Sequence, residues 1–263
     1  MTTQTVSVGV DFQGSIRSKD AATRFFDNFA SIYPELNFEL MGEILTSERE
    51  RFDRTKAIDE WQHDRGSRGV VHGYYQFEGK SPARFYASVV WHGQGTHKVW
   101  SDGIAVWFDD SFWAEKKIEE PSSKAVRLLE LLTTLGSPMY GRAYHWSEFE
   151  EKGFTTPKPP SSQILKHTIS LRPREGLEDI FWANYFGKPY VDIFGADTLR
   201  GVESSSKKAV GDGYLIVFGN SPFDWKRPEV RAMQDRAKQR LDHDAFFDRD
   251  RRIKPSLNLF SRV

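Results

Sequence analysis

The segments VVHGYYQF at residues 70–77, FYASVVW at 85–91 and VWSDGIAVWF at 99–108 decide the fold of this chain. Each segment is rich in β-branched and aromatic residues, which favour strands. Lys80-Ser81-Pro82 separates the first two segments, and His92-Gly93-Gln94-Gly95 separates the last two. Because turn-forming residues between such segments are typical of hairpins, the sequence predicts an antiparallel meander.

The residues before this meander predict one more strand and a helix. Apolar residues alternate with small or polar ones over residues 6–12, which indicates a half-buried strand. Apolar residues recur every three or four positions over 22–32, which predicts an amphipathic helix that ends before Pro34. Charged residues dominate from Ser47 to Arg68, and we expect a solvated helix or loop that crosses the surface.

The residues after the meander predict further helices and a strand. Leucines on one face predict a helix over 124–135 that stops at Gly136. The aromatic segment 177–186 is predicted to be helical. A short apolar strand is expected at 214–218, and proline begins another helix over 228–241.

Together these segments predict an α+β protein, a mostly antiparallel sheet with helices packed on it. A proline-rich stretch at 153–162 predicts a linker between an N-terminal half, 1–152, and a C-terminal half, 163–263. The two halves can also pack as one domain. Both halves place a strand before a helix that follows proline, so two similar interleaved halves stay open as an interpretation.

Composition argues against several kinds of partner and site. The 37 Lys and Arg residues balance 37 Asp and Glu residues, so no overall charge points to nucleic acid or an anionic membrane. Without cysteine, the chain forms no disulfide, zinc–thiolate site or thiol nucleophile. The N-terminus lacks the pattern of a signal peptide, and no segment approaches the roughly 18 apolar residues of a membrane helix. We therefore expect a cytoplasmic protein with no nucleic-acid or membrane partner.

The acids that follow the meander give an alternative with metal chemistry. Asp109-Asp110 precedes Glu115 and Lys117, and acids beside a lysine hold Mg²⁺ in one large class of nucleases. The spacing is loose, and a solvated charged turn explains the same residues. The His-Asp pairs at 63–64 and 242–244 lack further ligands at metal-binding spacing. We expect no cofactor and no enzymatic activity, with a metal-dependent hydrolase or nuclease that uses Asp109, Glu115 and Lys117 as the alternative.

Aromatic side chains are abundant along the meander. Successive strand residues point to opposite faces, so half of these rings lie in a core. The other half lie either under helices or on a surface that binds another protein. The rings concerned are Tyr74, Tyr75, Phe85, Tyr86, Trp91, Trp100, Trp107 and Phe108. A second predicted contact surface is the turn of Asp109, Asp110, Phe112 and Trp113, which combines acids with rings.

Aromatic and glycine-rich motifs occur mainly in the second half of the chain. They are Phe181-Trp182-Ala183-Asn184-Tyr185-Phe186-Gly187-Lys188-Pro189-Tyr190-Val191, Phe194-Gly195, Gly211-Asp212-Gly213-Tyr214, Ser221-Pro222-Phe223-Asp224-Trp225 and, in the first half, Tyr140-Gly141-Arg142-Ala143. Together these motifs resemble the immunity protein 52 family of bacterial polymorphic toxin systems. The resemblance implies a protein that binds and neutralises a cognate protein toxin delivered by a neighbouring cell. A structural component of phage or secretion machinery is the third interpretation. The sequence does not define the oligomeric state.

Overall fold

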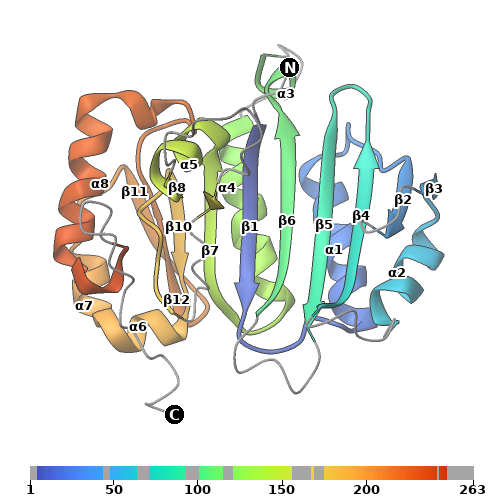
Figure 1. Ribbon diagram of the computed structural model, residues 1–263, viewed down its shortest axis with the longest axis horizontal. Helices are drawn as coiled ribbons and strands as arrows, with labels where there is room; N and C mark the ends of the chain where they lie inside the picture. The colour runs from blue at the N-terminus through green and yellow to red at the C-terminus, as the bar shows by residue number, and fades with distance from the viewer. Residues whose placement is uncertain are drawn as a thin grey trace.

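A computed structural model describes residues 5–43, 48–63, 71–92, 101–114, 121–155, 167–168, 175–241 and 243–247. Its central feature is a ten-stranded sheet in the order β11-β12-β10-β7-β1-β6-β5-β4-β2-β3, in which every pair of neighbours is antiparallel (Figure 1). The strands are β1 (Thr5–Phe12), β2 (Leu40–Glu43), β3 (Glu50–Arg51), β4 (Val71–Gly79), β5 (Phe85–His92), β6 (Asp102–Asp109), β7 (Pro138–His145), β10 (Ala183–Phe186), β11 (Ser206–Val210) and β12 (Gly213–Val217). A separate two-stranded sheet pairs β8 (Phe154–Thr155) with β9 (His167–Thr168). The predicted α+β class and the antiparallel meander β4-β5-β6 are confirmed.

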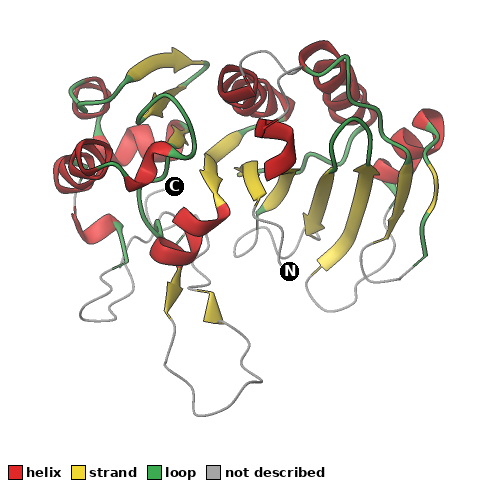
Figure 2. Ribbon diagram, turned by 90° about the horizontal axis from the view of Figure 1, so that it is seen from above, coloured by secondary structure: helices red, strands yellow, loops and turns green. Residues whose placement is uncertain are grey.

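Helices lie on both sides of the large sheet (Figure 2). They are α1 (Lys19–Ile32), α2 (Arg54–Gln62), α3 (Asp110–Ala114), α4 (Pro121–Leu132), α5 (Trp146–Gly153), α6 (Lys188–Phe194), α7 (Ala196–Arg200) and α8 (Pro228–Arg240). One side carries α1, α2 and α4, and the other side carries α5, α6, α7 and α8 over β7, β10 and β12 (Figures 1 and 2). Within the described residues, no helix combines the length and apolar character needed to cross a bilayer.

The larger core lies between the meander and helices α1, α2 and α4. Alternate strand residues such as Val8, Phe85 and Val106 are buried there with Phe25 and Phe29 of α1. Phe29 stacks on Phe85 at a ring-centroid distance of 5.3 Å. Such ring pairs add to the free energy gained from burying apolar area. This core therefore fixes which face of β1, β6, β5 and β4 is turned inward.

The charged stretch from Ser47 to Arg68 contributes to this core through α2. Its Trp61 is fully buried, and the indole Nε1–H donates a 2.9 Å hydrogen bond to the carbonyl of Ile16. Ala57, one turn earlier, is buried on the same side. The expected surface helix is thus present, but it is anchored by two side chains of one face.

The two predicted halves share one sheet. β7 belongs to residues 1–152 and pairs with β1 on one side and with β10 of residues 163–263 on the other. Most of the predicted linker at 153–162 lies outside the described residues. The predicted helix over 177–186 is wrong, because Ala183–Phe186 forms strand β10 in the sheet interior. That strand is buried on both faces and therefore lacks the alternation that marks a half-buried strand.

The start of α1 gives a prediction about stability. The Ser18 hydroxyl oxygen accepts a 3.1 Å hydrogen bond from the backbone N–H of Ala21. We expect Ser18→Ala to lower the free energy of unfolding by about 1 kcal/mol, because an N-terminal N–H of the helix loses its acceptor. Urea denaturation of both proteins measures this difference, and Ser18→Asp, which keeps an acceptor, should match the wild type.

Candidate protein-interaction face

One side of β1, β6, β5 and β4 faces away from α1, α2 and α4, and we call it the open face. Its described side chains are Ser7, Gly9, Asp11, Gln76, Glu78, Tyr86, Ser88, Val90, Gly103, Ala105, Trp107 and Asp109, as the strand register fixes. No labelled helix lies in front of β6, β5 or β4 in Figure 1, which views this side. The described part of the chain therefore covers the open face with helices only at its inner edge, beside β7.

The open face carries a stacked pair of aromatic rings. Trp107 of β6 and Tyr86 of β5 are direct neighbours across the strands. Their ring centroids are 4.8 Å apart, and the planes differ by 15°. Both side chains keep partial exposure to solvent, whereas their strand neighbours Phe85 and Phe108 are buried in the core. Large half-exposed rings of this kind are enriched at protein interfaces.

The sequence predicted that the aromatic residues of the meander divide between a core face and the opposite face, and the described rings confirm this division. Tyr75, Phe85, Trp91 and Phe108 form the core side. Tyr86 and Trp107 form the surface side. The side chain of Tyr74 and all of Trp100 lie outside the described residues. Period-two alternation separates the two sets, and Tyr86 and Trp107 keep partial exposure to solvent.

Small residues form the row next to the aromatic pair. Gly9 of β1 lies opposite Ala105 of β6, which lies opposite Ser88 of β5. A Cβ built on Gly9 would approach the Cβ of Ala105 to 3.0 Å, so any larger residue at Gly9 would crowd the neighbouring strand. The middle of the open face consequently carries only small side chains, and Ser88 is itself buried there.

An acidic side chain lies at the inner edge of the open face. Asp11 of β1 lies opposite Gly103, and its Oδ1 would be 3.5 Å from a Cβ built on that glycine. Among the described residues, no hydrogen bond or ion pair holds the Asp11 carboxylate. Burial raises the pKa of Asp11 to about 6, an effect that the nearby Arg142 guanidinium partly offsets. The described residues thus hold this carboxylate where its ionised form is disfavoured, with no hydrogen-bond donor from among them.

Arg142 does not neutralise Asp11 directly, because Arg142 has other contacts. It forms an ion pair with Glu178. Its guanidinium carbon also lies 5.5 Å, 5.3 Å and 5.5 Å from the ring centroids of Tyr144, Phe149 and Phe181. Cation–π contacts and the ion pair both hold the side chain in place. Arg142 is therefore a structural residue that connects β7 to α5.

The turn predicted as a contact surface is only partly at the surface. Asp109 lies at the end of β6 on the open face and accepts a 3.0 Å hydrogen bond from the backbone N–H of Ser111. Phe112 is fully buried against Phe108, so the expectation of an exposed ring is wrong for Phe112. The short helix α3 turns that ring back into the core. Trp113 is half-buried, and whether this turn contacts a partner stays a prediction.

Asp110 lies beside a buried histidine, His145. The Nδ1 atom of His145 accepts a 3.2 Å hydrogen bond from the backbone N–H of Ser147, so Nε2 carries the proton. That Nε2 lies 3.4 Å from the Asp110 carboxylate. Burial lowers the pKa of His145, and Asp110 partly offsets this effect. Phe223, which is 40% exposed, packs on the His145 ring at 4.9 Å.

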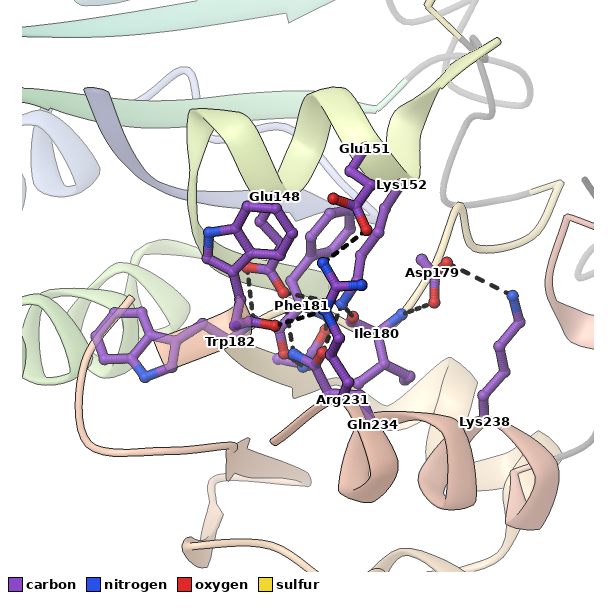
Figure 3. A network of polar contacts seen from close by, with 12 residues as sticks. Glu148, Glu151, Lys152, Asp179, Ile180, Phe181, Trp182, Arg231, Gln234 and Lys238 are labelled. Carbon is purple, nitrogen blue, oxygen red and sulfur yellow. Dashed lines mark hydrogen bonds and ion pairs between the residues drawn. The ribbon is translucent and has the colours of Figure 1, made fainter. Parts of the chain in front are cut away.

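A second polar cluster is buried between α5 and α8 (Figure 3). Glu148 of α5 is fully buried and accepts hydrogen bonds from Lys152 at 2.9 Å, from Gln234 of α8 at 2.9 Å and from the backbone N–H of Trp182 at 3.2 Å. The ammonium of Lys152 also donates to the carbonyl of Ile180 at 2.7 Å and to the Gln234 side chain at 2.6 Å. Its polar groups satisfy one another, which is the arrangement of a structural network.

The described residues do not provide a set of ligands for the metal ion of the hydrolase or nuclease interpretation. They contain no group of three or more His, Asp or Glu side chains placed to hold an ion. Asp109 is described, but Glu115 and Lys117 lie outside the described residues, as do Asp64 and Asp242. The hydrolase or nuclease interpretation therefore stays a prediction.

Comparison with known proteins supports the fold. No family model matches the chain, and no curated protein matches its sequence. A Pseudomonas aeruginosa T6SS protein, PA0821, has a similar structure, with a TM-score of 0.58 and 13% sequence identity. The alignment covers 97% of this chain and 78% of that protein. Sequence identity at this level shows only that the two proteins share a fold. The shared fold extends over both halves of this chain.

Proposed function

We propose that this chain is an immunity protein that binds a cognate bacterial toxin through the open face and so neutralises it. The observation that carries the proposal is the half-exposed Trp107–Tyr86 stack, on the side of the sheet where no labelled helix lies in front of β6, β5 or β4. Contiguous surfaces with large rings mark binding sites for other macromolecules. The T6SS designation of the structural neighbour is consistent with a secretion-related role.

The motifs that resemble the immunity protein 52 family lie in the core, apart from the proposed contact surface. Phe181, Trp182, Tyr185 and Phe186 are buried. They fill the cores around β10, so the resemblance concerns the scaffold. The open face comes from residues before 110 and lies outside those motifs. A scaffold with a separate contact surface suits a protein that must match one particular toxin.

The direct test begins with the neighbouring reading frames. A large secreted protein with a variable C-terminal domain supplies the candidate toxin domain, which is then co-expressed with this chain. Cells that carry the wild-type chain should survive, and the two proteins should co-purify. A Tyr86→Ala/Trp107→Ala variant should bind about 100-fold more weakly and lose protection, because central aromatic residues contribute most of the energy of an interface. Both rings lie outside the core, so circular dichroism should show an unchanged fold.

The matched control is Phe223→Ala, which removes another exposed ring from a different surface. It should bind and protect like the wild type. The reverse pattern, with binding lost in Phe223→Ala and kept in the double variant, would move the contact surface to the turn of α3. Death of cells that carry the wild-type chain, together with absence of binding, would reject the immunity function.

Two other functions have their own tests. A metal-dependent hydrolase or nuclease should bind Mn²⁺ through Asp109 and Glu115, and anomalous scattering from a soaked crystal would locate the ion. A structural component of phage or secretion machinery should form a symmetric assembly, which light scattering would detect. Neither outcome is expected from a stoichiometric inhibitor.

A further inference from the structure

The ten-stranded sheet ends at two edges of different length. At one edge, β3 consists of Glu50 and Arg51 alone. At the other edge, β11 spans Ser206–Val210, and its first four residues are exposed. The outer backbone groups of an edge strand are a template for pairing with another strand, and a very short strand offers few of them. Of the two edges, β11 is therefore the one at which the sheet can be extended.

The hairpin with β12 fixes which backbone groups of β11 turn outward. Its turn consists of Gly211 and Asp212, which lie between the paired residues Val210 and Gly213. Gly211 has a φ of +54°, the left-handed conformation that two-residue hairpin turns require. Residues that flank such a turn exchange hydrogen bonds with each other, so Val210 turns its backbone toward β12.

Bonded pairs alternate with non-bonded pairs along an antiparallel ladder, so every second residue of β11 turns its backbone away from β12. Counted back from the turn, these residues are Lys207 and Ala209. Val217, the partner of Ser206, agrees with this count, because its carbonyl accepts a 2.9 Å hydrogen bond from the adjacent Ser205 on the β11 side. The N–H and C=O groups of Lys207 and Ala209 are therefore the outer groups of this edge.

The two lysines of β11 do not shield this edge. Lysine on an edge strand is a common protection against further pairing. Here the Lys208 ammonium lies 2.5 Å from Glu130 of α4, and the Lys207 ammonium donates a 2.7 Å hydrogen bond to the Val202 carbonyl. Both side chains are thus held by groups of their own chain. Lys207 forms no ion pair with the residues that the structure describes, so its charge can pair with an acid from outside.

We infer that β11 is a site of strand addition, at which an extended segment of a partner protein pairs antiparallel with β11 and places an acidic side chain opposite Lys207. The backbone of the segment supplies donors and acceptors to Lys207 and Ala209, which is how proteins recognise an added strand. Antiparallel pairing continues the pattern of β10, β12 and β11. The acid follows from cross-strand pairing, in which opposite charges stabilise each other. This site goes beyond the proposed function and is separate from the open face.

A second copy of the chain fits this edge less well. Two β11 strands related by a two-fold axis form the most hydrogen bonds when Lys207 of each lies opposite Ala209 of the other. That register places Lys208 opposite the same residue of the second copy, and like charges in this position are destabilising. A register shifted to avoid this contact keeps only one bonded pair. The charge of β11 thus favours a foreign segment that carries an acid.

The geometry of the edge is tested first on the free protein. The amide hydrogens of Lys207 and Ala209 should exchange with solvent at least about tenfold faster than that of Lys208, which bonds to β12. Hydrogen exchange followed by NMR measures the three rates. The reverse order would overturn the inference, because other backbone groups would then face outward.

The site itself is tested with the peptide acetyl-Thr-Val-Thr-Glu-Thr-amide, titrated against the full chain by NMR. Its valine and glutamate can lie opposite Ala209 and Lys207, so the amide signals of these two residues should shift and saturate. The same peptide with N-methyl groups on valine and glutamate lacks the two donors and should give no saturable shift. Replacing its glutamate with lysine should weaken binding about threefold, the effect of one cross-strand charge pair.

Two variants of the chain complete the experiment. Ala209→Pro removes an outward N–H and keeps the bonds to β12, so it should stay folded by circular dichroism and lose the peptide. Ala209→Val keeps that N–H and should bind like the wild type. Equal binding by a folded Ala209→Pro variant, equal shifts with the N-methylated peptide, or no shift at Lys207 and Ala209 would overturn the inference.

Light scattering distinguishes the remaining occupant. A dimer of the wild type that Ala209→Pro dissociates would also overturn the inference, because a second copy would then occupy the edge. A monomer is the expected result. None of these outcomes depends on the toxin, so the proposed function and the strand-addition site can fail separately.

Discussion

Replacing Lys152 with methionine is expected to lower the free energy of unfolding by about 3–5 kcal/mol, because it leaves a buried carboxylate without its cation. Glu148 is fully buried, and the Lys152 ammonium lies 2.9 Å from its Oε1 (Figure 3). The same ammonium also bonds Ile180 and Gln234, so the substitution removes three hydrogen bonds at once. Urea denaturation at neutral pH measures the loss.

The loss of stability in Lys152→Met should depend on pH, because Glu148 is titratable. Burial raises the pKa of Glu148, and Lys152 is the largest influence in the opposite direction. Without Lys152 the pKa of Glu148 rises further, so the folded variant holds a proton that the unfolded chain has released. Stability of Lys152→Met should therefore fall relative to the wild type as the pH rises above the folded-state pKa of Glu148 in the wild type, which itself lies above 4.5. At lower pH both the folded and the unfolded chain hold the proton on Glu148, and the free energies of unfolding of the two proteins should become more similar.

The control is an ion pair of the same helical spacing at the surface. Lys188 lies 2.7 Å from Asp192, four residues later, and both side chains are more than half exposed. Lys188→Met should cost less than about 0.5 kcal/mol. The double variant Glu148→Gln/Lys152→Met should recover part of the loss, because it removes the charge that Lys152 compensates. A loss below 1 kcal/mol in Lys152→Met would show that water reaches Glu148.

Local pattern predicted the strands of the first half but not the side on which each ring would stay exposed. Tyr75 and Tyr86 have similar neighbours in sequence, yet Tyr75 is in the core and Tyr86 is on the open face. Alternation separates the two faces. Only the position of α1, α2 and α4, which depends on the whole chain, decides which face is covered. The sequence therefore leaves two alternatives for the interaction surface, which are the two faces of the meander.

The acidic turn illustrates a second limit. Phe112 follows two acids and precedes a charged stretch, a context typical of a surface ring. The helix α3 spans five residues and directs Phe112 to Phe108 and Tyr33. A change of direction over so few residues depends on tertiary packing. Asp11 was missed for a related reason, since its lack of a partner becomes visible only when β7 and β6 lie beside it.

The second large effect is expected from Asp11→Asn, which should stabilise the free protein at neutral pH. The pKa of Asp11 rises from 3.8 to about 6 on folding, and this difference corresponds to an upper bound of about 3 kcal/mol at about 1.4 kcal/mol per pH unit. Because the side chain keeps some contact with solvent, we expect a gain of about 1–2 kcal/mol. Asparagine has a similar shape and no charge to desolvate.

The sign follows from proton binding. Between pH 3.8 and about 6 the folded protein holds a proton on Asp11 that the unfolded chain has lost. Wild-type stability therefore falls as the pH rises through this window and then stays level. Asp11→Asn lacks that fall, so the advantage of the variant should be absent near pH 3.5 and complete near pH 7. Urea midpoints of both proteins at several pH values measure the difference, in which the titration of the other acids cancels.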